Sequence, residues 1–268
     1  MKVGLIGNAI KREQEDAISH LQVFLTECGY AVTRFSSHLE ISDVDVVVVL
    51  GGDGAILHAA VIAAQKAIKI IGINYGTLGF LTEYERDNTT KVLSLLQALE
   101  KNECKIVERS LLKATINGQT HYALNELAVQ RHLDPLSATS SQLMQVEVCL
   151  DGESDVIAGD GVLVCTPTGS TAFSLSAGGA IICPTTKVFM LTPICAFSMR
   201  SRPIVFSDEE TVKIRIQRGT ALALLDGKAI EQMQEGEEVI LEKAPFYAQF
   251  PVHSDSGFLS KIRNKLNK

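Results

Sequence analysis

The sequence predicts two domains: an N-terminal doubly wound, Rossmann-like α/β domain and, after it, a mainly β, sandwich-like domain. The first hundred residues alternate short apolar runs with stretches of helical period, which is typical of an open α/β sheet. After about residue 104, short strand-like runs follow one another with almost no helical pattern. We therefore expect an α/β domain over residues 1–103, onto which a tail over about 246–268 packs back, and a mainly β domain over residues 104–245.

In the first domain, each element follows from its own hydrophobic pattern. The run at residues 46–50 is four valines and a leucine, which is typical of a strand covered on both faces of a parallel sheet. Residues 14–28 place six apolar side chains on one helical face, and Gly29 ends that helix. The complete prediction has strands over residues 3–6, 31–35, 46–50 and 68–73, and helices over residues 14–28, 54–65 and 88–101.

The second domain is predicted from short β runs and the turns between them. Asn117-Gly118, Asp151-Gly152 and Arg218-Gly219 are dipeptides of the hairpin type. One short helix is expected near residues 171–177. The predicted strands cover residues 111–116, 122–130, 144–150, 162–165, 188–193, 211–217, 221–225 and 239–242.

Composition limits the classes of partner. The 268 residues include 25 Lys plus Arg and 31 Asp plus Glu, a net charge of −6, which argues against nucleic acid as the main partner. The basic run Lys261, Arg263, Lys265 and Lys268 is interpreted as a solvated tail. The six cysteines show no C-x-x-C spacing, which predicts reduced thiols in a cytoplasmic protein. The N-terminus is polar and no apolar window approaches the ~18 residues of a membrane span, so we expect a soluble protein.

The first candidate site is the tetrapeptide Gly51-Gly52-Asp53-Gly54, between a predicted buried strand and a predicted helix. Ligands of open α/β sheets bind at this end of the strands. Glycines let the backbone approach a phosphate, and the helix N-terminus offers unpaired N–H groups. An anion there suits a group that accepts a proton from an attacking hydroxyl or holds a metal ion, whereas a tight turn in which Asp53 caps the helix explains it equally well. The spacing is neither G-x-G-x-x-G nor Walker A.

Three further segments combine polar and small residues. Residues 74–82 form a glycine-containing loop after a buried strand, which turn chemistry alone also explains. Asn125 and Glu126 could hold a ribose diol or an adenine edge, or could be a polar pair on an edge strand. Asp160 precedes a buried strand, after which six hydroxyl side chains fall within eleven residues and favour a polar ligand over a simple capped turn: Thr166, Thr168, Ser170, Thr171, Ser174 and Ser176.

Together and in this order, these segments resemble the NAD kinases over nearly the whole chain. The run from Thr166 to Gly179 is the most specific part of the likeness, because other kinases share the GGDG tetrapeptide. The resemblance implies that Asp53 accepts the proton of the 2′-hydroxyl and that Gly51, Gly52 and Gly54 bind phosphate. It implies NAD-binding positions at Asp53, Gly54, His58, Asn125, Glu126, Ala158, Asp160, Thr171, Ala172, Phe173, Ser174, Leu175, Ser176 and Lys228.

The expected reaction is transfer of the ATP γ-phosphoryl group to the adenosine ribose 2′-hydroxyl of NAD, which gives NADP. Mg²⁺ is expected to arrive with ATP, since no cluster of Asp and Glu looks like a dedicated metal cage. The resemblance also implies a homodimer or homotetramer. Two alternatives stay open: another GGDG-type kinase acting on a lipid or sugar phosphate, and a non-catalytic dinucleotide-binding regulator.

Overall fold

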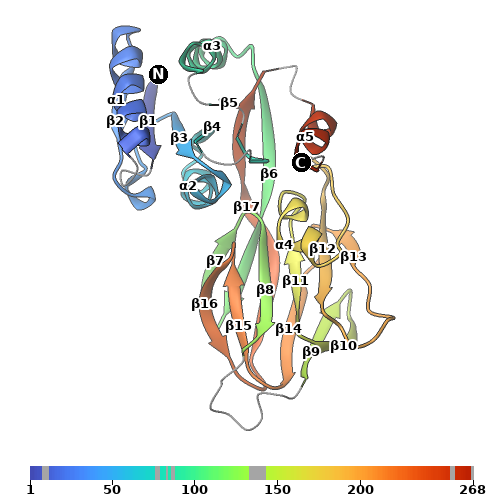
Figure 1. Cartoon of the computed structure of the whole chain (residues 1–268). Coiled ribbons are helices and arrows are strands. Elements are labelled where there is room, and N and C mark those ends of the chain that lie inside the picture. Colours follow the sequence, from blue (N-terminus) through green and yellow to red (C-terminus); the bar gives the residue numbers. More distant parts are fainter. Residues whose placement is uncertain are drawn as a thin grey trace. The chain divides into compact units, whose positions relative to one another are not determined.

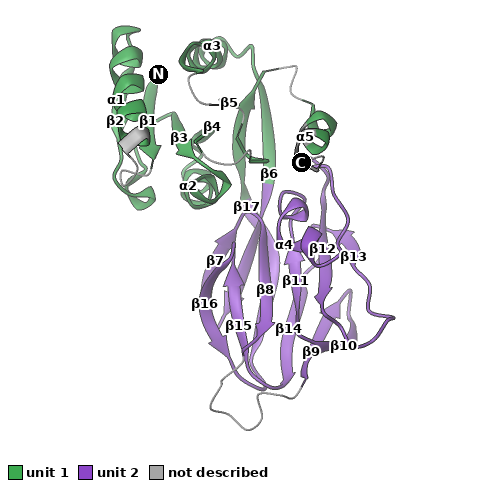
Figure 2. Ribbon diagram, viewed as in Figure 1, with its two compact units in different colours: residues 1–109, 246–268 green, residues 110–245 purple. Residues whose placement is uncertain are grey.

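The computed structural model describes residues 1–7, 12–75, 79–82, 84–85, 88–132, 143–253 and 257–266. Residues 76–78 of the predicted glycine-containing loop and Lys268 of the basic run lie outside the described residues. The chain divides into two compact units, shown in Figure 2: Met1–Arg109 with Phe246–Lys268, and Ser110–Pro245.

The first unit is built on a five-stranded parallel sheet with the strand order β2-β1-β3-β4-β5 (Figure 1). Its strands are β1 (Lys2–Gly7), β2 (Ala31–Arg34), β3 (Val46–Gly51), β4 (Lys69–Asn74) and β5 (Tyr84–Glu85). Its helices are α1 (Arg12–Glu27), the 3₁₀ turn η1 (His38–Glu40), α2 (Asp53–Gln65), α3 (Thr89–Glu100) and α5 (Phe258–Leu266). The predicted strands and helices of this unit are all present, whereas β5, η1 and α5 were not predicted.

Helices cover both faces of this sheet. The apolar sides of α1 and α3 pack in one cluster with alternate residues of β1, β3 and β4, among them Leu5, Val48 and Ile71. Helix α2 contacts β3 and β4 and has Ile56 and Leu57 among its buried residues. All six residues of β3 are buried, as the continuous valine run predicts. The predicted doubly wound α/β domain is therefore confirmed.

The second unit contains two antiparallel six-stranded sheets (Figure 1). In sheet order, the first has β10 (Glu153–Gly159), β9 (Met144–Leu150), β14 (Val212–Arg218), β17 (Glu238–Val252), β6 (Lys105–Ile116) and β7 (Gln119–Ala123). The second has β13 (Ile204–Ser207), β12 (Val188–Ile194), β11 (Gly161–Cys165), β8 (Glu126–Arg131), β15 (Ala221–Leu225) and β16 (Lys228–Met233). The 3₁₀ turn η2 (Gly169–Thr171) and the single-turn helix α4 (Phe173–Ser176) follow β11, while the ends of β6 and β17 belong to the first unit.

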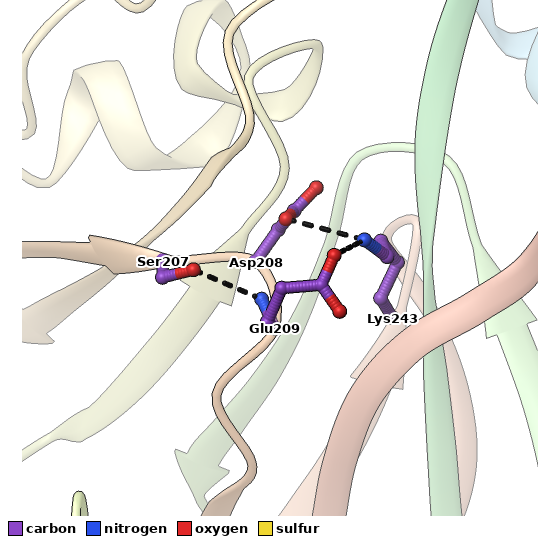
Figure 3. A network of polar contacts seen from close by, with 4 residues as sticks. All are labelled: Ser207, Asp208, Glu209 and Lys243. Carbon is purple, nitrogen blue, oxygen red and sulfur yellow. Dashed lines mark hydrogen bonds and ion pairs between the residues drawn. The ribbon is translucent and has the colours of Figure 1, made fainter.

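One apolar core joins the two sheets and confirms the sandwich. It contains Val129 and Val164 from one sheet and Val146 and Ile214 from the other. A buried polar contact joins them as well, as Figure 3 shows: Lys243 of β17 donates to Asp208, which follows β13 and is only 2% exposed. Lys243 also pairs with the exposed Glu209, whose N–H donates to the Ser207 hydroxyl.

Two predictions for the second unit were wrong. Residues 122–130 do not form one strand, because the chain breaks between β7 and β8 at Leu124 and Asn125, whose N–H groups donate to the Asp226 carboxylate. Arg218-Gly219 does not close a hairpin, because β14 and β15 lie in different sheets. The sequence patterns also missed β10, β13 and β16 and underestimated the length of β17. In the described part of the chain, no helix combines the length and apolarity needed to cross a membrane.

Candidate active site

The GGDG turn lies where β3 ends and α2 begins. Gly51 closes β3 beside Asn74 of β4, and Gly52 is the N-cap of α2. No side chain caps this helix, so the alternative in which Asp53 serves as the cap is wrong. A Cβ added at Gly52 or Gly54 would meet nothing within 4 Å. The turn therefore presents open backbone at the N-terminus of a 13-residue helix, an arrangement that favours anions.

The Asp53 carboxylate points to the loop that follows β4. Its Oδ2 accepts the N–H of Phe80 at 2.7 Å, and its Oδ1 accepts the N–H of Leu81 at 3.1 Å. These two contacts hold the carboxylate in one orientation beside the start of α2.

His58 lies on the same helix, five residues after Asp53, and is exposed. Its ring centroid lies 5.7 Å from that of His38 in η1. Burial, followed by the neighbouring His58, lowers the pKa of His38. The two imidazoles form a pair on the surface of α2, next to the turn that carries Asp53.

In the second unit, Asp226 fixes the backbone of Asn125 and Glu126. Asp226 occupies the left-handed position of the Asp226-Gly227 turn between β15 and β16, with φ of 47°. Its Oδ2 accepts from Leu124 N at 3.0 Å, and its Oδ1 accepts from Asn125 N at 2.8 Å and Glu126 N at 3.2 Å. Lys228, the first residue of β16, follows this turn and is exposed.

Glu126 begins β8 and carries a buried acid. The residue is 5% exposed, and its Oε2 atom is buried and has no hydrogen-bond partner among the described residues. Burial and, second, the charge of Asp226 raise the pKa of Glu126 to about 8. Its partner in the sheet is Cys165, a fully buried thiol whose pKa burial raises to about 12. Both groups are therefore protonated at neutral pH, and Glu126 can donate a hydrogen bond.

The hydroxyl-rich segment directs several of its hydroxyls inward. Thr166 Oγ1 donates to Leu124 O at 2.6 Å, and Ser170 Oγ donates to Pro167 O at 2.7 Å and accepts from Ile182 N at 2.9 Å. Ser174 is fully buried and bonded to the Thr192 hydroxyl at 3.0 Å. Thr171, Ala172, Phe173 and Leu175 are half-buried, and Ser176 is exposed. These contacts hold the segment against β8 and β12.

Asp160 and Ala158 lie at the opposite end of β11. The Asp160 carboxylate pairs with Arg131 at 2.7 Å, and Phe197 N donates to Ala158 O at 2.8 Å. Since Cys165 pairs with Glu126, the length of β11, about 16 Å at 3.3 Å per residue, separates Asp160 from Glu126. The structure therefore groups Asn125, Glu126 and Ser174 at one end of this strand and Ala158 and Asp160 at the other.

The local sequence signal missed three partners of these residues. Asp226 was not among the predicted site residues, and Arg131 lay just beyond the predicted strand over residues 122–130. The loop containing Gly79 was noticed only for its glycines. A search for a carboxylate in an Asp-Gly turn, where the side chain can accept nearby N–H groups, would have drawn attention to Asp226. Within the described ranges, no three His, Cys, Asp or Glu side chains gather as a metal site.

Two family models match the chain. The ATP-NAD kinase N-terminal domain matches residues 32–101, and the ATP-NAD kinase C-terminal domain matches residues 132–252. Among individual proteins, the NAD kinase of Methanothermobacter thermautotrophicus is 31% identical over 282 aligned positions, which cover 99% of this chain and 96% of that protein.

Solved structures are similar over the full length. An NAD kinase from Archaeoglobus fulgidus in complex with ATP has a TM-score of 0.79 at 26% identity and covers 100% of this chain and 98% of that one. Yeast NADH kinase complexed with NADH has a TM-score of 0.87 at 23% identity, with coverage of 100% and 87%, and at this identity it shows the fold alone.

Proposed function

The chain belongs to the NAD kinase family, and from this premise we propose how its residues carry out the ATP-dependent phosphorylation of NAD to NADP. It is a phosphotransferase, and the acceptor is the 2′-hydroxyl of the adenosine ribose. The GGDG turn supports the assignment of phosphate binding by Gly51, Gly52 and Gly54 to the first unit, because Gly52 and Gly54 leave the backbone open at the start of α2.

We propose Asp53 as the catalytic base. Its carboxylate is oriented by two N–H donors and accepts the 2′-hydroxyl proton late, as the bond to phosphorus forms, because a carboxylate is a weak base toward an alcohol. Phosphoryl transfer needs positioning and charge stabilisation more than covalent chemistry. Mg²⁺ belongs to the nucleotide substrate in this proposal. Mg²⁺ usually keeps several waters and is bound by substrate phosphates together with one or two carboxylates. Asp53 is the carboxylate that the GGDG turn offers.

In the first unit, Asp53, Gly54 and His58 are the proposed NAD-binding residues, and in the second unit they are Asn125, Glu126 and the residues named below. The supporting observation is the protonated Glu126, which can donate to a ribose or adenine acceptor, beside Asn125. Thr171, Ala172, Phe173 and Leu175 supply half-buried walls, and Ser174 fixes their position through Thr192. Ala158, Asp160, Ser176 and Lys228 complete the proposed set.

The observation that carries the mechanism is the Asp53 carboxylate held at the N-terminus of α2. The test is NADP formation from NAD, ATP and Mg²⁺ by the wild type and by Asp53→Asn, with NADH as a parallel acceptor. Removal of a general base costs about 10²- to 10⁴-fold in rate. In Asp53→Asn we expect a loss of turnover of this size, with the affinity for NAD largely retained.

Two outcomes would contradict this proposal in different ways. Equal turnover in Asp53→Asn would remove the base but leave the kinase assignment intact. If the wild type binds NAD but forms no NADP, ATP is not the phosphoryl donor. Inorganic polyphosphate would then replace ATP in the next assay.

We further propose that the protein forms a homo-oligomer whose subunits share NAD sites. Two observations support this. The candidate NAD-binding residues fall at opposite ends of β11, and exposed apolar side chains lie near its Asp160 end: Phe197, 79% exposed, and Met199, 82% exposed. Ile204 and Val205 on the outer strand β13 are also exposed. Light scattering of Phe197→Asp/Met199→Asp should show a smaller mass than the wild type; an equal mass would reject this surface.

The remaining proposal is a cytoplasmic location. All six cysteines are free, and such thiols persist in a reducing compartment. Cell fractionation with a tagged chain tests this directly, and recovery in a membrane fraction would contradict it.

A further inference from the structure

The contact between Asp53 and the loop after β4 is too close for any side chain at Gly79. A Cβ added at Gly79 would lie 2.5 Å from Asp53 Cγ and closer still to Oδ1, whereas real Cβ contacts are essentially never below 3.0 Å. The backbone at Gly79 does not adopt the left-handed conformation that favours glycine. Glycine is therefore needed here for space and not for backbone freedom.

We propose that residues 79–81 position the catalytic base: the absent side chain of Gly79 leaves the space that the Asp53 carboxylate occupies, and the N–H groups of Phe80 and Leu81 orient it. This inference rests on the proposed role of Asp53. Gly79 acts through the Asp53 carboxylate that lies against it and is therefore a positioning residue.

The far side of the same loop packs closely on β4, which opposes movement of the loop away from Asp53. A Cβ at Gly72 of β4 would lie 3.1 Å from Leu81 O and 3.3 Å from Thr82 Cα, which places the loop backbone directly on the sheet. Leu81 and Thr82 are 6% and 5% exposed. The atoms that a methyl group at position 79 would meet belong to the end of the Asp53 side chain and not to the backbone, so the methyl group is accommodated by displacement of that side chain.

This arrangement separates stability from activity. Displacement of one side chain relieves the collision at small structural cost, but it takes the base away from its two N–H donors and from the position of the acceptor hydroxyl. A displacement near 1 Å of a catalytic group can cost about 10²-fold in rate. Gly79→Ala should therefore lower kcat by about 10²-fold, change KM for NAD less than about twofold, and lower Tm by only a few degrees.

A double-mutant cycle tests whether Gly79 acts through Asp53. In Asp53→Ala the colliding atoms are gone, so adding Gly79→Ala should lower the residual kcat by less than about twofold. In Asp53→Asn the shape of the side chain is kept, so the added methyl group should still lower Tm. The control is Gly4→Ala on β1, where a Cβ would lie 2.6 Å from a Phe35 ring carbon in the same unit. Gly4→Ala should lower Tm by the same amount in the wild-type and Asp53→Ala backgrounds.

The outcomes distinguish this inference from the proposed function. If Gly79→Ala keeps kcat within about threefold of the wild type, or costs the same factor in Asp53→Ala as in the wild type, the positioning role is rejected while the base assignment stands. If the wild type forms no NADP, the proposed function fails, and if Asp53→Ala turns over normally, the assignment of Asp53 as the base fails while the kinase assignment stands.

Discussion

Glu126 and Asp226 are joined by two reciprocal hydrogen bonds, although 100 residues separate them in the sequence. The Glu126 N–H donates to Asp226 Oδ1 at 3.2 Å, and the Asp226 N–H donates to Glu126 O at 3.0 Å. The turn between β15 and β16 is thereby tied to the start of β8. Burial and, second, the nearby charge of Asp226 raise the pKa of Glu126.

Asp226→Asn should destabilise the second unit by about 2 kcal/mol, because an amide replaces a charged acceptor of three backbone N–H groups. The denaturant midpoint measures this loss. Asp151→Asn is the matched control, since Asp151-Gly152 is a hairpin turn with a similar φ of 52° and an exposed carboxylate. Equal stability in the two variants would show that the three contacts contribute little.

Stability should fall as the pH rises from about 4.5 to about 8. The pKa of Glu126 is raised from 4.5 to about 8, so in this window the folded state keeps a proton that the unfolded chain has lost. The stabilisation is complete below pH 4.5 and is lost as the pH passes the folded value, at up to about 1.4 kcal/mol per pH unit. Unfolding by urea across this range, with Glu126→Gln for comparison, measures the slope. An unchanged slope in that variant would assign it to other groups.

Asp208→Ala should cost about 2 kcal/mol of folding free energy, because it removes a buried acceptor from Lys243 between the two sheets. Glu209→Ala is the control. Glu209 pairs with the same Lys243 but its side chain is 72% exposed, so its removal should cost less than about 1 kcal/mol. The reverse order of the two losses would contradict the assignment of the buried carboxylate as the main partner.

Arg131→Met should raise KM for NAD by about tenfold and leave kcat within about twofold. The guanidinium holds Asp160 at 2.7 Å, and loss of one charge-assisted contact corresponds to about 1.4 kcal/mol, or a factor of ten in binding. Steady-state kinetics with varied NAD measures both constants. Lys213→Met, an exposed cation on β14, should change neither. An unchanged KM in Arg131→Met would separate Asp160 from NAD binding.

The sequence predicts best what is encoded locally. The valine run before Gly51 specified β3, and the glycines and Asp53 marked the turn after it. The hydroxyl-rich segment also stood out by composition, but composition does not say which way a hydroxyl points. Ser170 and Ser174 proved to be fully buried and bonded to the protein.

The contacts that complete the site are nonlocal, which is why the sequence did not predict them. Phe80 lies 27 residues from Asp53, and Asp226 lies 100 residues from Glu126. The second contact also ends β7 before Asn125, so the apolar pattern alone merged two strands into one. The hydrophobic period of a segment predicts which side chains are buried, but it does not predict which distant carboxylate accepts hydrogen bonds from its backbone N–H groups.

The division of the chain also sets an order of events during synthesis. The first unit comprises residues 1–109 and 246–268, so its sequence is interrupted by the whole of the second unit. Domains fold as units once their residues have left the ribosome, commonly the N-terminal one first. Here residues 110–245 are complete before the closing part of β17 has been made. The five strands of the parallel sheet all lie within residues 2–85 and are made first, whereas the segment 246–268 that completes the first unit is added only after residues 110–245 have been made.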